Sequence, residues 1–290
     1  MMEFDLKQLA ARKLILVAHR GVWGGNIPCN TSAAYETALR QGADMIEIDV
    51  DKSLDGRLFV FHPGMEPAHL NRRISVREMT GAQIKELRYV NIDNVETQFG
   101  IEELSEVLDR FRGRCFINID KFCDNPEEIA AAVRERGMAG QILVKTAPEE
   151  MNLELIERYC PDIPYMAMVK TPEEIERVAE RRLNYIGNEV LFRTEDHPFA
   201  SREFIEREHR CGRLVWCNAI VYNYLTVLSA GHNDDRALLE GPEEGWGWIA
   251  DRGYDFMQTD WVAMARQWLE ETGRLSRART RGDGDWGQSV

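Results

Sequence analysis

The sequence predicts an α/β protein whose fold is a modified TIM (β/α)8 barrel. Short apolar runs alternate with longer amphipathic stretches along most of the 290 residues. This alternation is typical of a parallel sheet covered by helices. The length suits a single barrel, which usually needs roughly 250 residues. A hydrophobic content of 44% and a charged content of 29% indicate an ordinary globular chain.

Nine apolar runs have the length and composition of strands. In chain order they are Leu14–Ala18, Met45–Val50, Leu58–Phe61, Cys115–Ile119, Gln141–Val144, Tyr165–Val169, Tyr185–Gly187, Leu214–Cys217 and Phe256–Gln258. A barrel of eight strands leaves one of the nine runs as an extra element. Tyr185–Gly187 is the weakest candidate for a strand, so we expect it to be the extra one. Asp51–Arg57 is too short for a crossover helix and contains the turn pair Asp55-Gly56. We therefore expect the second and third strands to be joined without a helix.

Amphipathic patterns between the runs predict the covering helices. The clearest is Thr31–Gln41, with Thr31 as its N-cap and Gly42 just past its end. The other helical patterns are Asn125–Arg136, Glu149–Tyr159, Pro172–Arg182 and Ala200–Arg210.

The chain contains no repeat of fixed period and no low-complexity linker. We therefore expect residues 1–274 to form one domain. Val221–Ala250 is predicted to be an elaborated loop, and residues 275–290 a polar C-terminal tail.

The chain is acidic, with a formal net charge of −13. Binding to nucleic acid or to an anionic membrane needs clustered Lys and Arg, so neither partner is expected. No apolar stretch approaches the roughly 18 residues of a membrane span, and Leu14–Ala18 is too short for a signal segment. The six cysteines form no CxxC pair. We interpret them as reduced thiols of a cytoplasmic protein.

Reactive polar side chains stand where four of the predicted strands end. The reactive groups of (β/α)8 barrels lie at the carboxyl ends of the strands. These strand-end residues are His19, Glu47 with Asp49, His62, and Asp120 with Lys121. Their common position predicts one catalytic centre.

Glu47 and Asp49 are two residues apart on one predicted strand, so their carboxylates point to the same face. Adjacent carboxylates repel, and one of them holds a proton unless a cation lies between them. A hard, oxygen-binding ion such as Mg²⁺ or Ca²⁺ is the natural occupant. The alternative is a pair of solvated acids at a strand end.

His19 and His62 flank this carboxylate pair. Imidazole titrates near neutral pH, so the two side chains suit a general acid and a general base, although each could instead be a core histidine. Arg20 is a candidate phosphate clamp because its planar fork matches phosphate oxygens. Its alternative role is an ion pair with Glu47 or Asp49.

The early motifs resemble the signature of the glycerophosphodiester phosphodiesterases. They are His19-Arg20-Gly21, Pro28-Cys29-Asn30-Thr31, Glu47-Ile48-Asp49-Val50, Asp55-Gly56 and Phe61-His62. The resemblance is specific over Leu14–His62 and continues more weakly to about Trp261. It implies a modified (β/α) barrel that uses a divalent metal to hydrolyse glycerophosphodiesters to glycerol 3-phosphate and an alcohol.

Carried over by position, the resemblance implies that Glu47 and Asp49 are metal ligands. His19 and His62 would form the acid–base pair, and Arg20 would bind phosphate.

The chain departs from the family pattern at the third ligand. That ligand normally belongs to an acid-x-Lys arrangement, but here Asp120 and Lys121 are adjacent. We favour Asp120 as the ligand. On an ideal strand Lys121 points the other way, so Lys145 is a second candidate for the cation, with a surface lysine as its alternative. Cys29 replaces the family's usual Glu, and Asn30 is assigned with Thr31 to capping the following helix.

Late echoes of the family include Trp216 and Asn218, which become candidate substrate-binding residues. Trp216 could line the substrate mouth or pack in the core. The polar segment Gly231–Arg236 could close over the site or form a solvated turn.

The predicted function is metal-dependent hydrolysis of a small-molecule glycerophosphodiester by His/His acid–base catalysis. One alternative is a phosphodiesterase of the lysophospholipase D or sphingomyelinase D kind that forms a cyclic phosphate. An exposed apolar rim beside the site would favour it. A catalytically inactive barrel that binds a polyol phosphate is the other. The leaving alcohol, the native metal and a homo-oligomeric state are left open.

Overall fold

Eight parallel strands close into a barrel in the computed structural model, which describes residues 4–223 and 225–277. The order around the ring is β1-β9-β8-β7-β6-β5-β4-β2, and β1 pairs back with β2. The predicted TIM-type barrel is confirmed. The ring strands are β1 (Ile15–Ala18), β2 (Met45–Lys52), β4 (Phe116–Asp120), β5 (Ile142–Thr146), β6 (Tyr165–Val169), β7 (Tyr185–Val190), β8 (Leu214–Asn218) and β9 (Phe256–Thr259).

The strand outside the ring is β3 (Leu58–Val60), which pairs antiparallel with β2. The expectation that the run Tyr185–Gly187 is the extra element was wrong, because β7 pairs with both β6 and β8. The strand signal of this run is weak in the sequence because it contains Gly187, and glycine has a low strand propensity. A Cβ atom at this position would lie 2.0 Å from the carbonyl oxygen of Leu214, so the close approach of β8 requires glycine.

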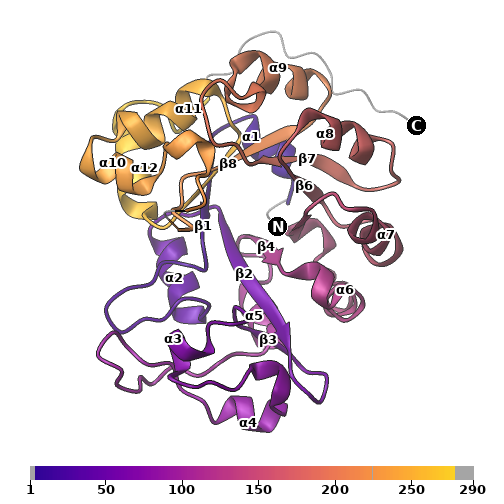
Figure 1. The fold of residues 1–290 in the computed structure, drawn as a ribbon, viewed down its shortest axis with the longest axis vertical. Helices are drawn as coiled ribbons and strands as arrows, with labels where there is room; N and C mark the ends of the chain where they lie inside the picture. Colours follow the sequence, from indigo (N-terminus) through magenta and orange to yellow (C-terminus); the bar gives the residue numbers. More distant parts are fainter. Residues whose placement is uncertain (1–3, 224, 278–290) are drawn as a thin grey trace.

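Helices surround the ring (Figure 1). Within the described residues they are α1 (Leu6–Ala10), α2 (Ser32–Arg40), α3 (Glu66–Leu70), α4 (Gly81–Lys85), α5 (Leu104–Phe111), α6 (Pro126–Glu135), α7 (Glu150–Tyr159), α8 (Pro172–Ala179), α9 (Arg202–Arg210), α10 (Asp234–Leu239), α11 (Trp248–Arg252) and α12 (Val262–Glu271). Thr31 caps α2 as predicted, accepting from the amide of Ala34 at 3.2 Å. In the described part of the chain, every helix is too short or too polar to cross a membrane.

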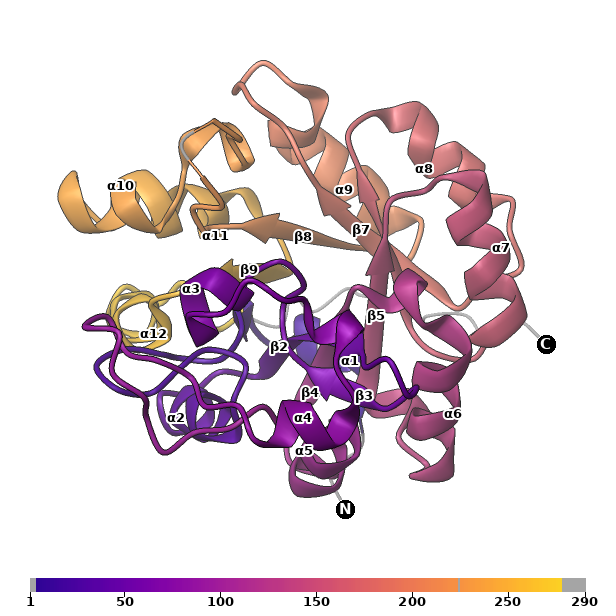
Figure 2. The same ribbon diagram turned by 60° about the horizontal axis from the view of Figure 1, so that its bottom comes forward.

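The largest core cluster lies between the strands and the covering helices. A second cluster joins inward residues of the strands, including Trp216 and Phe256, to Leu6 and Ala10 of α1. A third belongs to the excursion between β2 and α5, which carries β3, α3 and α4. Figure 2 shows this excursion lying beside β2 and away from α7 and α8.

The segment predicted as an elaborated loop, Val221–Ala250, is largely helical. It contains α10, a π-helical turn at Glu243–Gly247 and the start of α11. The predicted polar tail begins with ordered contacts, since the guanidinium of Arg277 pairs with Asp255 at 2.5 Å. Residues 278–290 of that tail lie outside the described residues.

Gly21 offers a test of the chain reversal after β1. It has a positive φ of 79°, and a Cβ there would lie 2.7 Å from the backbone of Ala34 on α2. Gly64 has a similar φ of 83° but nothing within 4 Å. We expect Gly64→Ala to lower the free energy of unfolding by about 1–2 kcal/mol through backbone strain alone. Gly21→Ala should cost about 1–3 kcal/mol more because of the clash. Equal losses in chemical denaturation would contradict this packing.

Candidate active site

Three carboxylates meet where the middle of β2 lies beside the carboxyl end of β4. The strand register places Glu47 opposite Asn118 and Asp49 opposite Asp120. Oxygen atoms from Glu47, Asp49 and Asp120 lie within 4.8 Å of one another. Glu47 and Asp49 are buried, whereas the side chain of Asp120 is 26% exposed. The group therefore opens towards solvent on the Asp120 side.

The two buried carboxylates are only partly neutralised by their neighbours. The amide of Arg20 donates to Glu47 Oε2 at 2.8 Å, and Arg20 Nε lies 3.0 Å from Asp49 Oδ2. Asn30 Nδ2 donates to the same Asp49 oxygen at 2.8 Å. Asp49 Oδ1 is buried without a hydrogen-bond partner. Burial, with the Asp49 charge adding to it, raises the pKa of Glu47 to about 7.

An unpartnered carboxylate oxygen beside two further acids fits a divalent cation. Such an oxygen costs free energy when buried unless something positive or protic contacts it. All three groups offer oxygen, which Mg²⁺ and Ca²⁺ prefer. The residues predicted as ligands are thus brought together in a form that suits the predicted metal.

Arg20 and Asn30 are placed by left-handed backbone. Their φ angles are 57° and 55°, a conformation that only Gly, Asn and Asp adopt readily. The chain reversal aims the amide of Arg20 at Glu47. The ion pair with Asp49, the alternative role considered for Arg20, is therefore present.

The two histidines sit in different electrostatic surroundings. His19 Nδ1 lies 3.0 Å from Asp260 Oδ1. Burial disfavours the charged imidazole, but the hydrogen bond to Asp260 and the Glu47 charge outweigh it, so the pKa of His19 is raised. His62 Nδ1 lies 2.9 Å from the carbonyl oxygen of Pro63. Burial lowers the pKa of His62, and Asp49 offsets only part of this shift.

The hydrogen bonds also indicate which nitrogen of each histidine carries a proton. A carbonyl oxygen can only accept, so His62 Nδ1 carries a proton and Nε2 of the neutral ring is free to accept one. The Asp260 carboxylate likewise accepts a hydrogen bond from Nδ1–H of His19.

Lys121 reaches the site although strict strand alternation would point it away. Its φ of 59° ends β4, and its Nζ lies 2.8 Å from Asp120 Oδ2. Burial favours the neutral acid, but the adjacent Lys121 charge outweighs it, and the pKa of Asp120 is lowered. Lys121 is thus a cation beside the third predicted ligand.

Lys145 is not a surface residue, so that alternative was wrong. Its side chain is 5% exposed, with Nζ 2.6 Å from Glu189 Oε2 and 3.8 Å from the centre of the Trp216 ring. Asn218 Nδ2 donates to Glu189 Oε1 at 2.6 Å, and Trp216 Nε1 donates to Asn218 Oδ1 at 2.9 Å. These four side chains form a buried network inside the barrel. Since Trp216 is fully buried, the geometry favours its core-packing role.

Sequence reasoning missed the roles of Asn30 and Asp260. Asn30 was assigned to helix capping, but its side chain joins Asp49 to the Tyr35 hydroxyl, which donates to Asn30 Oδ1 at 3.0 Å. Asp260 follows β9 directly, and the strand-end rule that identified His19 could have found it. Cys29 is buried, which raises the pKa of its thiol to about 12, so its neutral sulfur is a poor substitute for the family's Glu.

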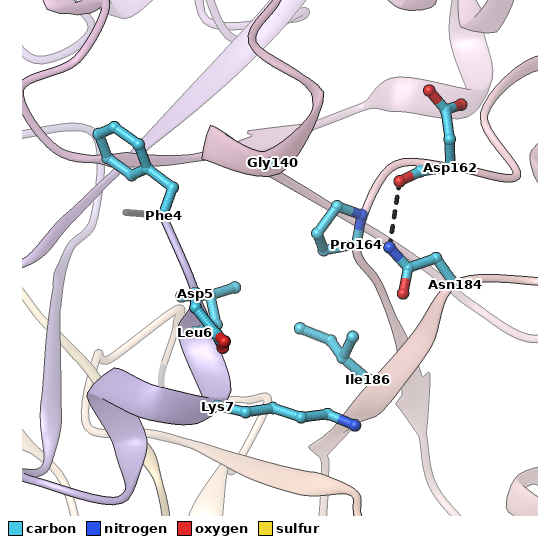
Figure 3. A pocket seen from close by; sticks show the side chains of 9 residues that line it. All are labelled: Phe4, Asp5, Leu6, Lys7, Gly140, Asp162, Pro164, Asn184 and Ile186. Atoms are coloured by element: carbon cyan, nitrogen blue, oxygen red, sulfur yellow. Dashed lines mark hydrogen bonds between the residues drawn. The ribbon is translucent and has the colours of Figure 1, made fainter. Parts of the chain in front are cut away.

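A separate pocket of about 410 Å³ lies at the amino ends of the strands, against α1 (Figure 3). It is lined by Phe4, Asp5, Leu6, Lys7, Gly140, Asp162, Pro164, Asn184 and Ile186. It contains none of the predicted site residues. The predicted site residues lie instead at the opposite end of the barrel.

The sequence is similar to one protein family and to several named enzymes. A family described as a domain of unknown function matches residues 164–269. The glycerophosphodiester phosphodiesterase of Bacillus subtilis (strain 168) is 26% identical over 227 residues, which are 71% of this chain and 76% of the relative. The protein of the same name from Caldanaerobacter subterraneus subsp. tengcongensis is 40% identical over 75 residues, which are 26% of this chain and 30% of the relative.

Solved structures share the barrel along almost its whole length. A glycerophosphoryl diester phosphodiesterase from Parabacteroides distasonis aligns with a TM-score of 0.76 at 18% identity, covering 96% of this chain and 95% of that chain. An Oleispira antarctica phosphodiesterase, solved in complex with the product sn-glycerol-3-phosphate, aligns with a TM-score of 0.61 at 20% identity, covering 89% and 97%. At these identities the likeness establishes the fold.

This chain resembles the glycerophosphodiester phosphodiesterases. The resemblance predicted from the sequence is therefore confirmed. The enzyme class predicted with it is the one that these relatives' names carry.

The pH dependence of stability tests the buried acid pair. Glu47 has a pKa of about 7 in the folded protein, against about 4.3 in an unfolded chain. Between these two pKa values the folded state holds a proton that the unfolded state lacks, and this proton stabilises the folded state. The stabilisation is lost as the pH rises through about 7. We expect the free energy of unfolding of chelator-treated protein to fall by about 1 kcal/mol more between about pH 6 and pH 8 in the wild type than in Glu47→Gln. Parallel pH profiles for the two proteins would contradict the assignment.

Proposed function

We propose that this protein hydrolyses glycerophosphodiesters to glycerol 3-phosphate and an alcohol, with a divalent cation and a pair of histidines. The observation that carries the proposal is the three-carboxylate group flanked by two imidazoles whose pKa values are shifted in opposite directions. Such a separation is what an acid and a base in one site require. The named relatives support the same activity.

Glu47, Asp49 and Asp120 would hold the cation, Mg²⁺ or Ca²⁺. When bound, it would stabilise negative charge on the phosphate oxygens and make bound oxygen nucleophiles more acidic. Arg20 and Lys121 add two fixed positive charges beside the carboxylates. Together with the cation, these charges would offset the three carboxylates and supply the local attraction that a phosphodiester needs in an acidic protein.

The two histidines divide the proton transfers. Neutral His62 accepts the proton of the attacking oxygen, a water or the neighbouring glycerol hydroxyl, through its free Nε2. His19, kept protonated by Asp260, donates a proton to the departing alkoxide. When water attacks, the new P–O bond forms as the bond to the alcohol breaks, giving glycerol 3-phosphate directly; His62 then loses its proton to solvent and His19 regains one. When the glycerol hydroxyl attacks, the alcohol leaves and a cyclic phosphate remains, which a water then opens with the two histidines in reversed roles, so that both return to their starting states.

Lys145, Trp216 and Asn218 are proposed to act behind the site rather than as direct phosphate ligands. Lys145 and Asn218 contact Glu189, Trp216 donates to Asn218, and all three side chains are buried. The Lys145 charge still lies close enough to Asp120 to favour its ionised form. The cytoplasmic location, the single domain 1–274 and a homo-oligomeric state stay predictions of the sequence.

Replacement of either histidine tests the acid–base assignment. We expect His19→Ala and His62→Ala each to lower kcat by about 10²–10⁴-fold, because each removes one proton-transfer group. Metal binding, followed by calorimetry, should stay near that of the wild type. Turnover of glycerophosphocholine should also stop with chelator and return with Mg²⁺, Mn²⁺ or Ca²⁺. Near-normal turnover in both variants contradicts the assignment.

An exposed apolar rim favours a second candidate, a lysophospholipid phosphodiesterase. The rim residues are Trp23, Ile92, Val95, Tyr222, Leu225 and Trp261, which are 46% to 93% exposed. They lie on segments that follow β1, β3, β8 and β9. The strands β8, β9 and β1 are neighbours in the ring, so the segments that follow them lie on one side of the barrel mouth. The segment after β3 joins them through a hydrogen bond in which Asn91 Nδ2 donates to Asn26 Oδ1 at 3.1 Å. Such a surface can accept an acyl chain.

The rim makes this candidate testable. We expect the combined variant Trp23→Ser, Leu225→Ser and Trp261→Ser to lower kcat/KM for lysophosphatidylcholine by roughly tenfold or more, because each lost methylene contact is worth about 0.8 kcal/mol. Glycerophosphocholine, which lacks the chain, should change less than about twofold.

Met151→Ser is the matched control for the rim variant. Met151 is 68% exposed and follows β5, on the opposite side of the ring from β9. It should leave both substrates unchanged. An equal loss of activity on both substrates in the triple variant argues for the glycerophosphodiester alone. Failure of lysophosphatidylcholine to react with the wild type argues the same way.

A further inference from the structure

Asp234 is a buried carboxylate that the proposed chemistry does not use. It begins α10 and is 1% exposed. Its Oδ1 accepts from the Thr259 hydroxyl at 2.6 Å and from Trp246 Nε1 at 2.7 Å. Its Oδ2 accepts from the amide of Asp260 at 2.9 Å. Three donors thus contact one carboxylate, and one of them is the backbone amide of Asp260, whose side chain contacts His19.

The Asp234 contacts fix the backbone after β9. The Thr259 hydroxyl that donates to Asp234 also accepts from the amide of Trp261 at 2.9 Å. Two consecutive amides, those of Asp260 and Trp261, are thus held by side-chain oxygens where the strand ends. Backbone amides at a strand end have no ladder partner, and without such acceptors the turn could adopt other conformations. The carboxylate of Asp260 leaves this turn and reaches His19 Nδ1.

Asp234 is itself anchored to the barrel. Its amide donates to the carbonyl oxygen of Ala219, next to the end of β8, at 2.6 Å. Asn233 caps α10 by accepting from the amide of Arg236 at 2.9 Å. Trp246, the third donor, is 1% exposed in the π-helical turn. The segment after β8 therefore lies packed behind β9.

We propose that Asp234, with Thr259, is a positioning residue for catalysis: it holds the Asp260 turn so that the Asp260 carboxylate keeps the His19 imidazole in its working orientation. The inference rests on the proposed function and assigns a role to the polar segment Gly231–Arg236. It also gives a role to a part of residues 164–269, the stretch that matches a domain of unknown function. Proton transfer depends steeply on such geometry.

Two substitutions remove the support without removing a group that contacts substrate. Asp234→Asn replaces one acceptor oxygen by a donor, and Thr259→Val removes the hydroxyl at nearly constant volume. We expect each to lower kcat on glycerophosphocholine by roughly tenfold, with KM within about twofold, since binding groups are untouched. Thr259→Ser keeps the hydroxyl and should restore most of kcat.

Asp255→Asn is the matched control for lost stability. Asp255 is equally buried, at 1%, and directly precedes β9 at its other end. It accepts from the amide of Val215 and from His209 Nε2 and Arg277. This variant should lower Tm without lowering kcat. A kcat for Asp234→Asn that stays near the wild type, with only Tm reduced, would overturn the proposal.

A double-mutant cycle decides whether Asp234 acts through Asp260. In an Asp260→Asn background, Asp234→Asn should cause no further loss of kcat. The same tenfold loss in both backgrounds would overturn the proposal.

A measurement that needs no turnover separates this proposal from the proposed function. The Nδ1 proton of His19, observed by NMR in selectively labelled protein, should give a protected downfield signal in the wild type. That signal should disappear in Asp260→Asn and weaken in Asp234→Asn, but not in Asp255→Asn. An unchanged signal in Asp234→Asn overturns the positioning role, even if the enzyme proves to act on another substrate.

Discussion

The repulsion between two buried carboxylates on β2 is the interaction on which the rest of the site depends. Glu47 and Asp49 lie on one face of the strand, and with Asp120 their oxygens fall within 4.8 Å of one another. At an effective dielectric constant of about 20, two unit charges this far apart interact by roughly 3–4 kcal/mol. Arg20 and Asn30 offset part of this cost, but Asp49 Oδ1 has no hydrogen-bond partner. The unfavourable arrangement fits the proposed cation site, where binding of the ion would recover the lost stability.

Closure of the barrel completes the site around that pair. His19 and Asp260 are 241 residues apart in sequence, and they meet because β1 and β9 pair as neighbours in the ring. The same closure places β1 beside β2, which lets the Arg20 amide reach Glu47. His19 and Asp260 therefore come from opposite ends of the chain, so their contact depends on the whole barrel being folded.

The alternation of strands and helices, the position of His19 at a strand end and the shared strand face of Glu47 and Asp49 could be predicted because they follow from local pattern. Features set by backbone geometry or tertiary contacts could not. Strand alternation predicts that Lys121 points away from the site, but its left-handed φ lets the side chain reach Asp120. The close approach of β8 explains why Gly187 interrupts a genuine strand. The burial of Lys145 depends on Glu189 and Trp216, which lie far along the chain.

Proton release on metal binding tests the central claim most directly, because it couples the cation to the raised pKa of Glu47. Chelator-treated protein would be titrated with Mg²⁺ or Ca²⁺ by calorimetry in buffers of different ionisation enthalpy. With a Glu47 pKa of about 7, binding should release close to one proton at about pH 6, about half a proton at pH 7 and almost none at about pH 8.5. Glu47→Gln should abolish this pH-dependent release. Tight metal binding with no proton release at any of these pH values would contradict the account.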